Sequence, residues 1–91
     1  MPTTKALERY RRTVEEAVAA IGRDEVGVRV AGEGGGMLAV TFSRGSQVHI
    51  AHVSAWELEH PERARVAVKT ALLVFSKRIA QETLARAAVA V

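Results

Sequence analysis

The sequence predicts a single α+β domain, residues 1–91, in the order helix, three-stranded antiparallel meander, long helix. Three observations predict it. Apolar residues recur every three or four positions near both ends of the chain, which is the period of an amphipathic helix. Between these ends, apolar and polar residues alternate over three short stretches, which is the period of a strand. Glycine-containing turns separate the stretches, so neighbouring strands can pair antiparallel.

The first helix is predicted over residues 4–22. Its apolar face consists of residues spaced three or four apart: Leu7, Tyr10, Val14, Ala17, Val18 and Ile21. On the opposite face, Glu8 and Arg12 are four residues apart and can pair weakly. Gly22 is a natural end for this helix, because glycine readily adopts the left-handed conformation that ends many helices.

Three strands are predicted next, at residues 26–31, 38–43 and 48–53. Four of the five residues in 32–36 are glycine, which permits positive φ, so we expect a tight hairpin turn there. A second turn is expected at 43–46. The alternation predicts one buried face of the sheet, made of Val28, Val30, Leu38, Val40, Phe42, Val48 and Ile50.

The second half of the chain begins with Ser54-Ala55-Trp56-Glu57, which has the capping-box spacing and predicts a short helical turn. We expect Trp56 to pack at this junction. Pro61 is suited to the first turn of a new helix, which should run to about Ala87. Its core stripe is predicted to be Val68, Leu72, Phe75 and Ile79, widened by Val66, Leu73 and Ala80.

The apolar ridge of the last helix continues almost to the end of the chain. A folded chain of this length buries only about 60–65% of the surface that its unfolded form exposes, so its core is thin. We therefore predict that a second copy covers part of the apolar surface, giving a homodimer. The predicted dimer contacts are Leu73, Leu84, Ala88 and Val91.

The chain has no cysteine, so disulfides, thiol catalysis and thiolate metal sites are excluded. No apolar run approaches the roughly 18 residues of a membrane span, and no apolar segment of a signal peptide follows the charged N-terminus. We therefore expect a cytoplasmic protein with no membrane partner.

The basic residues gather in the two helices, although the net charge of the chain is only +3. Residues 61–91 carry six basic and two acidic side chains. Basic helices beside a near-neutral sheet suggest a polyanion partner, although a solvated helix face would look the same. The candidate DNA contacts are Lys5, Arg9, Arg12, Arg63, Arg65 and Lys69.

No pattern in the sequence predicts catalysis, a cofactor or a metal. The glycines of 32–36 lie between two strands without a following Gly-Lys-Ser/Thr, unlike a phosphate-binding loop. His49 and His52 are three apart on a strand and face opposite sides, whereas His60 is placed to cap the last helix. No serine has a nucleophile-elbow motif around it. We therefore expect a protein that is not an enzyme and holds no cofactor.

The order of elements, together with several short stretches, resembles the YbaB/EbfC family of small bacterial nucleoid-associated proteins. The main stretch is the glycine-rich turn and Leu/Val-rich strand of residues 32–42, followed by a glycine turn at Gly45. A third strand with Val48 and Ile50, and the helical stretch 78–82, also fit the family. The resemblance covers roughly residues 26–86.

The resemblance implies a homodimer with the sheets at its centre and the helices projecting as arms. It also implies binding of double-stranded DNA with low or modest sequence preference, a nucleoid-associated location and no enzymatic activity. The sequence thus predicts a small dimeric DNA-binding protein. The alternative is a dimeric adaptor or secretion-chaperone-like module that holds a protein client through its sheet face and apolar C-terminus.

Overall fold

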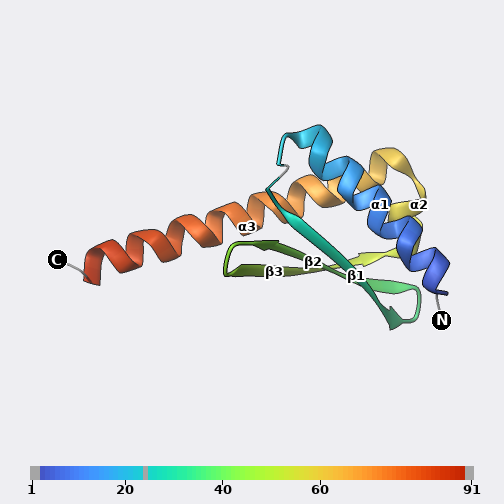
Figure 1. Cartoon of the computed structure of the whole chain (residues 1–91), viewed down its shortest axis with the longest axis horizontal. Coiled ribbons are helices and arrows are strands. Elements are labelled where there is room, and N and C mark those ends of the chain that lie inside the picture. Colours follow the sequence, from blue (N-terminus) through green and yellow to red (C-terminus); the bar gives the residue numbers. More distant parts are fainter. Residues whose placement is uncertain (1–2, 24, 90–91) are drawn as a thin grey trace.

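The computed structural model describes residues 3–23 and 25–89 and confirms the predicted α+β order (Figure 1). The three strands pair antiparallel in the order β1-β2-β3, and the helices lie on one side of the sheet (Figure 1). The elements are α1 (Thr4–Ile21), β1 (Gly27–Gly34), β2 (Met37–Arg44), β3 (Gln47–Ser54), α2 (Ala55–Glu59) and α3 (Pro61–Val89).

Both ends of α1 are capped, and the predicted end at Gly22 is confirmed. The side chain of Thr3 accepts a hydrogen bond from the Ala6 amide at 3.1 Å, which satisfies a free donor of the first turn. Gly22 adopts the left-handed conformation, with φ of 85°, and its amide donates to the Ala19 carbonyl at 3.0 Å. The face that α1 buries carries Tyr10, Val14, Ala17 and Val18.

Two tight turns set the register of the sheet. Gly35 and Gly36 form the first, and both have positive φ, 61° and 76°, which a type I′ turn requires and glycine supplies without strain. The second turn has positive φ only at its first central residue, Gly45, as in a type II′ turn. It places Arg44 opposite Gln47, and this pairing fixes the position of every later residue of β3.

The predicted buried face was wrong for β3. Because the turn places Arg44 opposite Gln47, Phe42 lies opposite His49 and Val40 opposite Ala51. Directly opposed residues share a face, so the core side of β3 carries His49, Ala51 and Val53. Val48 and Ile50 lie on the open face of the sheet, 46% and 52% exposed. Alternation gives the spacing of side chains, but the turn decides which set faces inward.

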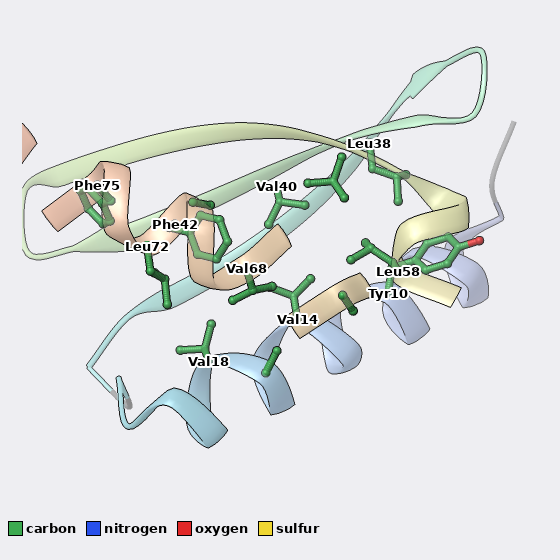
Figure 2. Packing of buried hydrophobic residues seen from close by; sticks show 14 residues of the cluster. Tyr10, Val14, Val18, Leu38, Val40, Phe42, Leu58, Val68, Leu72 and Phe75 are labelled. Carbon is green, nitrogen blue, oxygen red and sulfur yellow. The ribbon is translucent and has the colours of Figure 1, made fainter. Parts of the chain in front are cut away.

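The core forms between the sheet and the helices (Figure 2). Leu38, Val40 and Phe42 of β2 are almost completely buried. The residues of α3 in the same cluster are Ala64, Val68, Ala71, Leu72 and Phe75. Ile79 packs at the margin, which confirms the predicted core stripe.

The predicted widening of the α3 stripe was wrong. Val66 is 64% and Leu73 55% exposed, and Ala80 is exposed as well. These residues lie on a side of α3 that neither α1 nor the sheet covers. The C-terminal part of α3 projects past the sheet (Figure 1), and almost all of its described residues after Ile79 are exposed. The described chain is therefore elongated, with extents of 50 × 25 × 18 Å.

The predicted capping box is present at the start of α2. The Ser54 hydroxyl accepts from the Glu57 amide at 3.2 Å, and the Glu57 carboxylate accepts from the Ser54 amide at 3.1 Å. Trp56 packs at this junction only against neighbouring side chains and remains 53% exposed. Its ring lies 4.4 Å from the ring of His60 and 5.7 Å from the guanidinium of Arg63.

The register of β3 predicts unequal effects of two substitutions in the sheet. Phe42→Ala leaves a cavity in the core and should lower the free energy of unfolding by about 3–5 kcal/mol. Val48→Ala removes an exposed side chain and should change it by no more than about 0.5 kcal/mol. Urea denaturation of both variants measures the difference. A large loss for Val48→Ala would show that this residue is buried.

Candidate functional site

The candidate DNA contacts of α1 lie together. Thr4, Lys5, Glu8, Arg9 and Arg12 line one shallow depression on the exposed side of the helix. The positions 5, 9 and 12 are four and three apart, so their side chains leave the helix on one face, as the sequence predicts.

A neighbouring arginine engages the acidic residues of α1. Arg11 forms ion pairs with both Glu8 and Glu15. The hydrogen bonds from Arg11 lower the pKa of the Glu8 carboxyl, and the same contacts raise the pKa of Arg11. Among the described residues, none of the six candidate DNA contacts forms an ion pair. The cations of the α1 face therefore keep their charge available to solvent or to a partner.

The structure joins one cation of α3 to this face and separates another from it. Arg9 and Arg65 line the same groove, between α1 and the first turns of α3. Lys69 is exposed one helical turn further along α3. Arg63 is two residues from Arg65, about 200° around the helix, and lies on the other side beside Trp56. Arg9 and Arg65 thus share one groove, whereas Arg63 lies on the other side of α3.

Acidic groups border the groove that Arg9 and Arg65 line. Glu16 and Glu59 also contribute to its walls. Glu59 accepts a hydrogen bond from the Tyr10 hydroxyl at 2.8 Å, which ties α2 to α1. The positive charge is therefore greatest at Lys5, Arg9 and Arg12 and weaker toward α2.

A second feature lies on the opposite side of α3. The groove between β3 and α3, here called the β3–α3 groove, has a volume of about 400 Å³. Small residues, Ala51, Ala67 and Ala71, make it hollow, and Val66 and Val74 stand along its helical wall. The remaining lining residues are His49, His52, Val53, Glu57, Arg63 and Thr70.

The β3–α3 groove was not predicted from the sequence, because the wrong residues of β3 were expected to face inward. Two signals in the sequence could have found it. The segment 47–54 contains no Lys, Arg, Asp, Glu or Pro, although it had to lie at an edge of the sheet. Alanines at 67 and 71, one turn apart, mark a helix side that packs loosely.

His49 links the groove to the core. Its ring stacks on Phe75 with 5.8 Å between centroids, and Arg78 Nη1 lies 3.4 Å from its Nδ1. Burial and the positive charge of Arg78 both lower the pKa of His49. The neutral ring is therefore the form that the folded protein favours.

The predicted dimer contacts do not form one continuous patch on a single chain. Leu73 lies near the β3–α3 groove, whereas Leu84, 70% exposed, lies on the projecting part of α3 about 16 Å further along the helix. Ala88 is exposed beyond it, and Val91 lies outside the described residues.

The open face of the sheet is mixed in character. Val48, Ile50 and Met37 are its exposed apolar side chains. His52 Nδ1 donates to Glu33 Oε1 at 2.6 Å on the same face. No group of three His, Asp or Glu side chains is placed to hold a metal ion within residues 3–23 and 25–89. Over the same residues, no helix has the length and apolar character needed to cross a membrane.

Comparison of the chain with protein-family models, with curated proteins and with solved structures finds no match.

The pKa of His49 predicts a pH dependence of stability. Because folding lowers this pKa, the unfolded chain binds the proton more readily, and stability should fall as the pH drops from about 6.5 toward 5. Carboxyl groups titrate mainly below about pH 5, so they contribute little to the change in stability over this range. Thermal unfolding across these pH values measures the effect. His49→Phe should flatten the dependence, and an unchanged slope in that variant would contradict the assignment.

Proposed function

We propose that the protein is a small homodimeric, nucleoid-associated DNA-binding protein of the cytoplasm, without enzymatic activity. One observation carries the proposal: Arg9 of α1 and Arg65 of α3 line a common groove, and Arg9 also belongs to the exposed cationic face with Lys5 and Arg12. The resemblance of the sequence to the YbaB/EbfC family points the same way.

The chemistry of this surface suits duplex phosphates. Its flexible cationic side chains lie on two adjoining helices, and a dimer doubles their number. Contacts of lysine and arginine with phosphates provide affinity and orientation but carry no sequence information. We therefore expect weak binding with little sequence preference, with a dissociation constant of about 10⁻⁴–10⁻⁶ M at physiological salt.

Arg11 has a supporting role in this proposal. Glu8 and Glu15 form their ion pairs with Arg11 and not with Arg9 or Arg12. The arrangement favours the DNA proposal over the simpler explanation that the basic residues of α1 only balance its acids. Arg11 is therefore not among the proposed phosphate contacts, because its guanidinium is engaged by Glu8 and Glu15.

The DNA proposal predicts the outcome of the double substitution Arg9→Ala/Arg12→Ala. Binding to unrelated duplexes should weaken about equally, and the slope of log affinity against log salt should flatten by about two units for each copy that contacts DNA. The control is Arg29→Ala/Arg44→Ala, which removes the same charge from the sheet. If both double substitutions weaken DNA binding equally, the binding depends on the net charge of the protein and not on a particular site.

The unmodified protein provides the decisive result for this proposal. Failure to bind any duplex at about 50 mM salt and tens of micromolar protein would overturn it, because non-specific binding strengthens steeply at low salt.

A second candidate function is the dimeric adaptor that holds a protein client. The β3–α3 groove favours it, because this groove is lined by small and apolar residues and lies beside an open strand edge. Salt dependence separates the two functions. Binding through an apolar groove should respond little to salt, whereas binding to DNA should fall steeply.

A further inference from the structure

The outer edge of β3 is open for pairing. The turn hydrogen bond joins Arg44 to Gln47, and hydrogen-bonded pairs then alternate along an antiparallel ladder. The bond from the Ala55 amide to the Gly36 carbonyl, at 2.8 Å, continues this alternation. The backbone amides and carbonyls that point away from β2 are therefore those of Val48, Ile50 and His52.

The edge formed by β3 also lacks the features that protect strand edges. Its eight residues include no proline and no lysine, arginine or carboxylate, and its pairing with β2 has no bulge. The opposite edge, β1, carries Arg29 and Glu33 and has an irregularity between Gly32 and Gly34. The contrast indicates that a partner covers β3 and not β1.

The helix above this edge exposes an apolar stripe. Val66, Leu73 and Val74 are exposed on α3, with Thr70 between them. Thr70 lies three or four residues from each of the other three, so all four share one side of the helix. Val66, Thr70 and Val74 line the β3–α3 groove, so the stripe and the open edge form one continuous surface. Such a surface is typical of an interaction site.

The surface is complementary to itself. One end of β3 lies near Phe75 and Arg78, which contact His49, and the groove continues past Val53 to Arg63 at the other end. The middle of β3 is therefore level with Thr70, the middle of the stripe. A single two-fold axis perpendicular to the sheet can pair β3 with a second β3 and pack α3 against a second α3.

We propose that a second copy of this chain covers β3 and the β3–α3 groove, so that two sheets join into one of six strands. The inference rests on the homodimer of the proposed function and specifies its contact. Centred on Ile50, the antiparallel pairing uses every outward backbone group of Val48, Ile50 and His52. Val48 then lies opposite His52 of the other copy.

The same axis accounts for the projecting end of α3. With Thr70 at the centre, Ile79 of one copy is level with Pro61 of the other, since each is nine residues from the centre. Leu84 lies about 7.5 Å further along and comes beside the partner copy's exposed Trp56. Both helical layers are on one face of the joined sheet. Each α1, which packs beside β1, lies at an outer flank and remains accessible to DNA.

A single cysteine tests the strand pairing directly, because the natural chain has none. In the proposed dimer the two Ile50 Cα atoms lie about 5.5 Å apart, within disulfide range. Ile50→Cys should form a covalent dimer in high yield under mild oxidation. Thr41→Cys is the matched control, because Thr41 is directly opposite Ile50 on β2 and its copies would be about 14 Å apart.

Two outcomes would overturn the proposal. One is a monomer at tens of micromolar by light scattering, a concentration at which an interface of about 1,200 Å² or more should hold. The other is a dimer in which Ile50→Cys does not cross-link, or Thr41→Cys cross-links equally well. A sandwich through the open faces would place the sheets about 10 Å apart and favour neither disulfide.

Substitutions on α3 give an independent measurement. Leu73→Asp and Leu84→Asp should each raise the dimer dissociation constant at least tenfold, because each places a carboxylate in a dehydrated contact. Met37→Asp adds the same charge on the open face and should leave the constant unchanged; equal weakening by all three variants would count against the proposed contact. A monomer that still binds duplex would overturn this contact alone, whereas a cross-linked dimer that binds no duplex would overturn the DNA proposal alone.

Discussion

The packing of α3 and α1 against one face of β2 is the contact on which the rest of the structure depends. Leu38, Val40 and Phe42 of β2 are each about 1% exposed and lie in one cluster with Val68 and Leu72 (Figure 2). Because β2 is the central strand, this contact fixes both hairpins. The helices cover only one face of the sheet. Apolar surface therefore remains exposed at the outer edge of β3 and on the projecting end of α3.

The distribution of charge follows from the same arrangement. The sides of α1 and α3 that face away from the core carry the cations, and Arg11 holds two of the nearby carboxylates. The edge strand β3 carries no Lys, Arg, Asp or Glu, whereas Glu57 and Arg63 are the charged residues that line the β3–α3 groove. A dimer through the uncharged edge leaves the charged sides exposed, so the proposed assembly and the proposed DNA contact need different surfaces and can coexist.

The sequence was sufficient for the order of elements, because helical periodicity, alternation, Gly22 and the capping box at Ser54 are local signals. It failed where side-chain orientation depends on geometry beyond the element. Both residue sets of β3 alternate equally well, and only the two-residue turn at Gly45 selects His49 and Ala51 as inward-facing. Likewise, α3 has apolar residues around most of its circumference, so periodicity could not show that Val66 and Leu73 lie outside the core. The shared groove of Arg9 and Arg65 depends on how two helices pack, which their separate sequences do not specify.

Amide hydrogen exchange along β3, followed by NMR at increasing protein concentration, tests the central claim most directly. The amides of His49, Ala51 and Val53 point toward β2 and should be protected at every concentration. Those of Val48, Ile50 and His52 should exchange quickly in the dilute monomer and become protected as the dimer forms. Fast exchange of these three amides in a sample that light scattering shows to be dimeric would contradict the account.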